Sequence, residues 1–151
     1  MDKTNANKKS GKVLVQGAIQ PDAIANSIAK HSTKTSIGAH DIFLGQVRSD
    51  VSGSSQVSSI EFSVYEEMAE EQFHTIREAA FKKFEIICMH IYHSIGTVNA
   101  GEICLFVFVS ARHRQQAFEA CRWIVEEIKA KVPVFGKEIY HDNTHSWKVN
   151  Q

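Results

Sequence analysis

The spacing of hydrophobic positions changes several times along the chain, and each change predicts a new element. Ile60, Phe62 and Val64 alternate with polar residues, a period of two that predicts a strand with one face toward solvent. Between residues 66 and 84 the apolar positions instead recur every three or four residues, as one face of a helix requires. The same helical spacing returns between residues 113 and 131. The chain therefore mixes strands and helices.

Other β-rich and helical stretches complete this pattern. The expected strands cover residues 12–16, 41–48, 57–64, 86–92, 102–110, 137–141 and 146–150, and the expected helices cover residues 21–31, 66–84 and 113–131. Segments rich in turn residues predict loops at 49–56, 93–101 and 142–144. Residues 1–11 are polar and lysine-rich, which predicts a disordered tail. Residues 12–151 are then long enough for a single domain.

The order of these elements indicates a fold class. From residue 57 to residue 141 it is strand, helix, strand, strand, helix, strand, the order of a ferredoxin-like βαββαβ unit. We therefore expect an α+β protein in which flanking strands enlarge this core into a mixed or antiparallel sheet. This prediction does not specify a function, because folds of this kind host many unrelated activities.

Composition narrows the class of protein. The chain is 43% hydrophobic and balances 17 Lys and Arg with 17 Asp and Glu, which is typical of a globular protein and argues against a nucleic-acid-binding module. The longest apolar run, residues 103–109, is far shorter than the ~20 residues that span a bilayer. Three cysteines, Cys88, Cys104 and Cys121, favour reduced thiols over a disulfide framework. We expect a cytoplasmic protein with neither a membrane nor a nucleic-acid partner.

The helix expected at residues 113–131 begins with charges of an unusual sign. Arg112, His113 and Arg114 stand at its N-terminus, where the helix dipole favours Asp or Glu. A bound anion would relieve this repulsion, because the free N–H groups of a helix start already favour phosphate. The alternative is that both arginines are solvated, at a cost of about 0.3–1 kcal/mol.

Further basic residues follow at the other end of this helix. Lys129 and Lys131 lie where cations stabilise the dipole, so helix capping explains them without a ligand. A helix of this length is about 25 Å long, so Lys129 shares a pocket with His113 only if a loop or a large ligand bridges the gap, as in an extended groove. Beyond Pro133, Gly136 allows a close backbone approach, and Lys137 alone would be interpreted as a surface lysine.

The histidines do not predict a metal site. His90 and His93 are separated by an odd number of strand positions, which points them to opposite faces. His141 and His145 can meet across the last hairpin, but a third ligand is missing nearby in sequence. We therefore expect no bound metal.

Several segments together resemble a known family, the large, catalytic subunit of molybdopterin synthase. The resemblance covers about residues 12–150, in the right order and spacing, and pairs a "GxVR" strand end with "HRxxAFEA" and "IKxxVPxFxKE". The segments that carry it are "IFLGQVR" (42–48), "FSVYEEMAEEQ" (62–72), "GTVNAGE" (96–102), "HRQQAFEACRWIVEEIKAKVPVFGKE" (113–138) and Trp147.

The resemblance implies a fold, a reaction and partners. The fold would be of the α/β-hammerhead type, in a homodimer that binds two copies of a small ubiquitin-like subunit to form a heterotetramer. The C-terminal thiocarboxylate of that small subunit would supply sulfur to cyclic pyranopterin monophosphate, producing the dithiolene of molybdopterin. The family requires no metal and no cofactor of its own in this subunit.

The resemblance also implies roles for individual residues. Arg48, His113 and Arg114 would line an anionic substrate pocket, and Lys129 and Lys137 would be catalytic. Lys129 would act as an acid or base, or as charge support for an acyl intermediate and its oxyanion. The full set of implied substrate-binding residues is Gln46, Val47, Arg48, His113, Arg114, Lys129, Gly136, Lys137 and Glu138.

One position departs from the family pattern. Many members have two adjacent basic residues before the glutamate, whereas this chain has Gly136 and Lys137 before Glu138. Either Lys137 replaces the missing lysine, or the chemistry relies on Lys129 alone. The alternative is that loss of the lysine at position 136 abolishes catalysis. The chain would then be a binding protein that retains the anion pocket and the groove for the partner tail but does not turn over substrate.

Overall fold

The computed structural model describes residues 13–148. The tail expected at residues 1–11 and the end of the strand expected at 146–150 lie outside this range. The strands are β1 (Leu14–Gln16), β2 (Ala39–Gln46), β3 (Val51–Ser52), β4 (Ser55–Val64), β5 (Ile86–Asn99), β6 (Ile103–Ala111), β7 (Val134–Tyr140) and β8 (His145–Trp147). The helices are α2 (Pro21–Lys30), α3 (Glu66–Lys83) and α4 (Arg114–Lys131).

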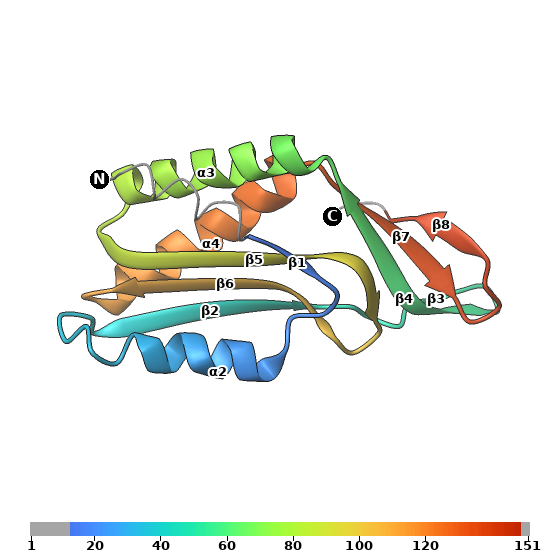
Figure 1. The fold of residues 1–151 in the computed structure, drawn as a ribbon, viewed down its shortest axis with the longest axis horizontal. Coiled ribbons are helices and arrows are strands. Elements are labelled where there is room, and N and C mark those ends of the chain that lie inside the picture. The colour runs from blue at the N-terminus through green and yellow to red at the C-terminus, as the bar shows by residue number, and fades with distance from the viewer. Residues whose placement is uncertain (1–12, 149–151) are drawn as a thin grey trace.

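The strands form one mixed sheet. Its order is β2-β6-β5-β4-β7-β8, with β1 beside β5 and β3 beside β4. The β1–β5 pair is parallel and the other named pairs are antiparallel. Helices α3 and α4 cover one face of the part built from β2, β6 and β5, and α2 lies on the opposite side (Figure 1). The expected α+β class and the βαββαβ element order from β4 to β7 are confirmed.

The long strand β5 connects two parts of the sheet. Its first part, from Ile86 to His93, pairs with β6, and its last part, from Gly96 to Asn99, pairs with β4. Gly96 adopts a φ of 84° at this change of partner, a conformation that side chains with a Cβ rarely adopt. The prediction of a loop at residues 93–101 is therefore wrong for residues 93–99, because pairing with neighbouring strands keeps this segment extended.

Other boundaries also differ from the sequence prediction, and three of them bear on the candidate site. The loop expected at 49–56 is largely a hairpin between β3 and β4, with Gly53 at φ 63° in its turn. Strand β2 ends at Gln46, two residues before Arg48, and β7 begins at Val134 rather than at Lys137. In each case pairing with a neighbouring strand decides the boundary, and the local composition does not reveal it.

Three hydrophobic clusters hold these layers together. The largest lies between the sheet and helices α3 and α4, where Phe73, Val107 and Ile124 are fully buried. A second, built on Phe106 and Phe108, lies on the α2 side of the sheet. Each such side chain contributes about 1.5–3 kcal/mol by leaving water. A third, smaller cluster joins the two parts of the sheet.

Candidate functional site

The third hydrophobic cluster fixes the position of the chain just after β2, where Arg48 follows. It is built from Val47, Ile60 and Val98, which are at most 4% exposed. The backbone N–H of Val47 donates to the carbonyl oxygen of Glu102 at 3.0 Å, and the N–H of Gly101 donates to that of Val47 at 2.8 Å. Val47 is thus a structural anchor at the junction of the two parts of the sheet, and it fixes where the following arginine leaves the sheet.

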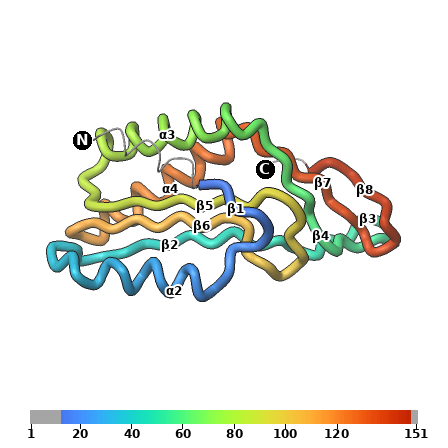
Figure 2. The backbone as a smooth tube through the Cα atoms, in the orientation of Figure 1, coloured from blue at the N-terminus to red at the C-terminus, as the bar shows by residue number. Residues whose placement is uncertain are grey.

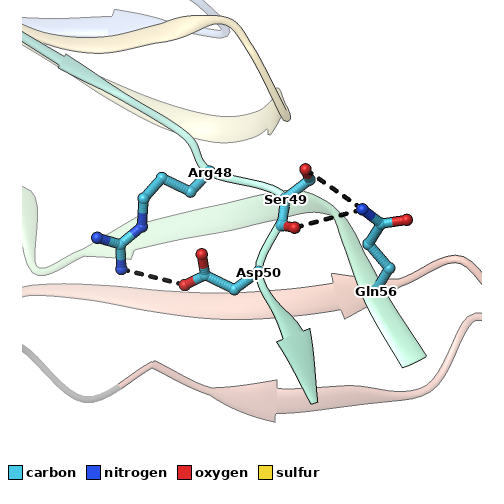
Figure 3. Close-up of polar contacts among 4 residues, drawn as sticks. All are labelled: Arg48, Ser49, Asp50 and Gln56. Carbon is cyan, nitrogen blue, oxygen red and sulfur yellow. Dashed lines mark hydrogen bonds and ion pairs between the residues drawn. The ribbon is translucent and has the colours of Figure 1, made fainter. Parts of the chain in front are cut away.

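Arg48 itself projects into solvent from this anchor. Its side chain is 70% exposed, and its Nη2 donates to Oδ2 of Asp50 at 3.0 Å. Nε2 of Gln56, on β4, donates to the carbonyl oxygen of Ser49 at 3.4 Å, which ties the segment after β2 to the neighbouring strand (Figure 3). An exposed ion pair of this kind is worth at most about 1 kcal/mol, so an anionic ligand can displace Asp50.

Lys129, on the last turn of α4, lies close enough to two other side chains to affect their ionisation. Burial and, more weakly, the positive charge of Lys129 together lower the pKa of His93 to about 4, against the hydrogen bond to Ser94, which raises it. Burial raises the pKa of the Cys104 thiol, while the charges of Lys129 and, more weakly, Lys148 oppose that rise. The Cys104 thiol donates to the carbonyl oxygen of Gly45 at 3.5 Å, one residue before Gln46. Lys129 therefore lies at the same end of the sheet as Gln46 and Arg48.

His93 is a neutral, buried neighbour of Lys129. It is 5% exposed, and its Nδ1 donates to the carbonyl oxygen of Ser94 at 2.8 Å. Its ring meets the ring of Phe62 edge to face, with centroids 5.5 Å apart. With Nδ1 carrying the proton, Nε2 is left as an acceptor at neutral pH. Sequence reasoning had considered His93 only as a metal ligand and missed this position.

The segment from Gly136 to Glu138 crosses the same region on β7. Gly136 pairs with Phe62, Lys137 with Glu61, and Glu138 with Ile60. Nζ of Lys137 lies 3.2 Å from Oε1 of Glu61 and 5.8 Å from the centre of the Trp147 ring.

Neighbouring residues on a strand point to opposite faces. The structure therefore places Lys137 on the face of Glu61 and Trp147, and it does not bring Lys137 to the face of Gly136.

His113 and Arg114 lie at the opposite end of the sheet. In the β2–β6 register Ala39 pairs with Ala111, whereas Gln46 pairs with Ile103. Arg48 follows the second pair and His113 follows the first, so about 25 Å of strand separates them. Figure 2 shows β2 and β6 running side by side over this length.

A single chain therefore does not bring Arg48, His113 and Arg114 together in one pocket. Antiparallel pairing of β2 with β6 sends their connected segments to opposite ends. The chain instead gathers Gln46, Val47, Arg48, Lys129, Gly136 and Glu138 at one end. The helix start with its His-Arg pair forms a separate exposed patch at the other end.

The described part of the chain has neither a metal-binding cluster nor a membrane-spanning helix. Among residues 13–148, no three His, Cys, Asp or Glu side chains are grouped so that they could hold a metal ion. Within the same residues, none of the helices has the length and apolar character needed to cross a membrane. The three cysteines are free thiols, as expected. Cys121 is buried, and burial, followed by the neighbouring Asp41, raises its pKa to about 12.

Comparison with known proteins places this arrangement in a family. The model of the MoaE protein family matches residues 14–131. The molybdopterin synthase catalytic subunit of Pyrococcus abyssi is 42% identical over 107 residues, which cover 71% of this chain and 72% of that protein. The corresponding subunit of Thermoplasma volcanium is 38% identical over 110 residues, covering 73% and 80% of the two chains.

Solved structures agree with these sequence matches. Molybdopterin synthase from Staphylococcus aureus superposes with a TM-score of 0.79 at 28% identity, covering 92% of this chain and 97% of that chain. A complex of subunits 1 and 2 of the molybdopterin-converting factor from Helicobacter pylori gives 0.77 at 20% identity, covering 91% and 90%, which supports the fold. The family model spans well over half of the chain, and this chain therefore belongs to the MoaE protein family.

Proposed function

We propose that this chain is the catalytic subunit of a molybdopterin synthase. It transfers sulfur from the thiocarboxylated C-terminus of a small ubiquitin-like subunit to cyclic pyranopterin monophosphate, forming the dithiolene of molybdopterin. It acts in the cytoplasm without a metal or cofactor of its own. The names of the sequence relatives support this activity, and the two-subunit Helicobacter pylori complex supports a small partner.

The single observation that carries the proposal is the placement of Lys129. It lies at the junction of the two parts of the sheet, beside neutral His93 and at the end of the sheet from which Arg48 projects. When the thiocarboxylate sulfur bonds to a substrate carbon, it displaces an oxygen substituent of that carbon, which leaves with the bonding electrons and takes up a proton. The tail is then an acyl group on that sulfur. Water then attacks this carbonyl and releases the tail as a carboxylate, leaving sulfur on the substrate. The Lys129 ammonium stabilises the oxyanion that develops in this step.

Arg48 holds an anionic group of the substrate beside Lys129. A guanidinium pairs with phosphate oxygens through two parallel hydrogen bonds, and Asp50 holds Arg48 only through an exposed ion pair. Substrate phosphate then replaces Asp50 as the partner of Arg48.

A second copy of the chain explains how His113 and Arg114 can act with Arg48, although they lie at opposite ends of the sheet in one chain. In the proposed homodimer, this exposed patch of one copy faces the Lys129 end of the other and completes the anion pocket. Each active site then combines Arg48 and Lys129 from one copy with His113 and Arg114 from the other. This arrangement brings Arg48, Lys129, His113 and Arg114 into one site although a single chain separates them.

Mixing two inactive variants tests both the activity and its shared site. Lys129→Ala and Arg114→Ala are each purified and assayed for molybdopterin formation with the thiocarboxylated small subunit and cyclic pyranopterin monophosphate. After subunits exchange, a mixed dimer has one site with both defects and one intact site, so activity returns. Mixing Lys129→Ala with Arg48→Ala, which affect the same end, gives no recovery.

Different failures of this experiment have different meanings. If the wild-type chain forms no dithiolene product, the sulfur-transfer proposal is wrong. If the wild type is active but the mixture of Lys129→Ala and Arg114→Ala does not recover, the shared site is wrong and the activity stands.

One observation favours a second candidate, a binding protein without turnover. Gly136 lacks the side chain that many family members carry there, and Lys137 is held on the other face by Glu61 and Trp147. This candidate predicts that the chain binds the small subunit and the pyranopterin but forms no product in the same assay.

A further inference from the structure

Lys148 lies directly across from Gly136. Its backbone N–H donates to the carbonyl oxygen of Gly136 at 2.8 Å, which continues the β7–β8 pairing in which Lys137 faces Trp147. A Cβ built on Gly136 would lie 3.7 Å from Cβ of Lys148. In an antiparallel pair, residues directly opposite one another point to the same face. Lys148 therefore projects from the face to which a side chain at position 136 would belong.

This face is the one that meets the junction of the two parts of the sheet. A Cβ on Gly136 would also lie 3.2 Å from Cγ2 of Ile60 and 3.6 Å from Cε1 of Phe62, and Ile60 and Phe62 belong to the cluster that anchors Val47. Lys137 points away from it, toward Glu61. Of these two lysines, Lys148 rather than Lys137 is thus on the face of the junction.

The charges of two lysines converge at this junction. Cys104 belongs to the same cluster as Ile60 and Phe62. Burial raises the pKa of its thiol, and the positive charges of both Lys129 and Lys148 oppose that rise. Two ammonium groups near one partly buried group raise the local positive potential, and an anionic ligand relieves their mutual repulsion.

We propose that two lysines, Lys148 just after β8 and Lys129 on α4, together bind an anionic group of a reactant at the junction beside Gly136. This group is a phosphate or a thiocarboxylate. Lys148 thereby supplies the cation that Gly136 lacks, from the neighbouring strand. The inference rests on the proposed function for the identity of the reactants, but the two-lysine site can be tested without turnover.

Binding of simple anions provides the first test. Inorganic phosphate and thioacetate are titrated separately into the ¹⁵N-labelled full chain, and amide shifts near Cys104 are followed in the wild type, Lys148→Ala and Lys131→Ala. Lys131, which pairs with Glu127 at 2.7 Å, is the matched control. We expect Lys148→Ala to bind about fivefold more weakly, as for loss of one exposed ion pair, and Lys131→Ala to match the wild type. If Lys148→Ala weakens the binding of phosphate, the ligand is the phosphate group of the substrate. If it weakens the binding of thioacetate, the ligand is the thiocarboxylate of the tail.

Kinetics separate this inference from the proposed function. If the wild type forms product, Lys148→Ala should lower kcat/KM for one reactant while Lys131→Ala does not, and an unchanged value overturns the role of Lys148. If the wild type forms no product, the proposed function is wrong, and the anion titration alone shows whether the two-lysine site exists. Equal anion affinities in all three proteins, or equal losses in both variants, then overturn the two-lysine site.

A rescue variant tests whether the two positions are equivalent. Gly136→Lys in the Lys148→Ala background returns an ammonium to the same face from the other strand. We expect this double variant to recover most of the lost anion affinity, with circular dichroism confirming that it is folded. A folded double variant that binds no better than Lys148→Ala contradicts the shared position.

Discussion

Nε2 of His31, at the end of α2, lies 3.1 Å from Nε2 of His90 on β5. Nδ1 of His31 donates to the carbonyl oxygen of Ser27 at 2.8 Å, so that nitrogen carries a proton. In the neutral ring Nε2 of His31 is then an acceptor, and His90 donates to it. This hydrogen bond holds the end of α2 against β5.

This pair predicts a loss of stability in mild acid. Burial, followed by the charge of His31 and then those of Arg77, Lys34 and Lys30, lowers the pKa of His90 from 6.5 to about 4. Between these two values the unfolded chain binds more protons than the folded chain, so the free energy of unfolding falls as pH falls through this window. The urea midpoint, measured from pH 7.5 to 4, should therefore decrease steadily below pH 6.5.

A substitution separates His90 from other groups that titrate in this window, including His93. In His90→Gln the side-chain amide still donates to His31 but does not titrate, so the urea midpoint should depend less on pH. The control is His74→Gln on the exposed side of α3, which should follow the wild type. Equal pH dependence in His90→Gln and the wild type would falsify the assignment.

Lys129→Ala should nearly abolish sulfur transfer and leave the fold intact. Lys129 is an exposed residue of α4, so its truncation leaves the core side of the helix unchanged, while loss of one oxyanion-stabilising group costs about 100- to 1,000-fold in kcat. Molybdopterin formation and thermal unfolding are measured together. Lys131→Ala, two residues along the same helix, should keep wild-type activity; a fully active Lys129→Ala would refute the catalytic role.

Phe108→Ala should destabilise the chain by about 3–5 kcal/mol. Phe108 is 0% exposed, and its ring lies 4.9 Å from the ring of His31 and 6.0 Å from that of Phe106. The truncation opens a cavity beneath α2 and removes support for the histidine pair. Urea unfolding measures the change. Phe118→Ala, at a residue that is 56% exposed on α4, should change stability by less than about 0.5 kcal/mol.

Gly96→Ala should destabilise the bend of β5 by more than about 1 kcal/mol. Gly96 has a φ of 84°, and an added Cβ would collide with Nε2 of Gln16. Gly101 has a similar φ of 91° but open space around it. Gly101→Ala therefore measures the backbone strain alone, and Gly96→Ala should be the less stable variant in urea. Equal stabilities would show that Gln16 moves aside without cost.

Elements with a strong local pattern could be predicted from the sequence. The apolar stripes of α3 and α4, with Phe73 and Ile124 buried on them, follow from a period near 3.6 that is independent of the rest of the fold. The alternation in β4 and the resemblance to a family likewise depend on residues close together in the chain. These local signals determined the element order, the fold class and the candidate residues.

Only the tertiary structure decided which candidates meet. Strand pairing extended β5 to Asn99 and turned the Ser/Gly segment into a hairpin, because hydrogen bonds to a neighbouring strand outweigh weak local preferences. The antiparallel β2–β6 register separated Arg48 from His113, and the β7–β8 register set Lys148 opposite Gly136. Register joins residues far apart in the sequence, so residue types and their local spacing cannot specify it.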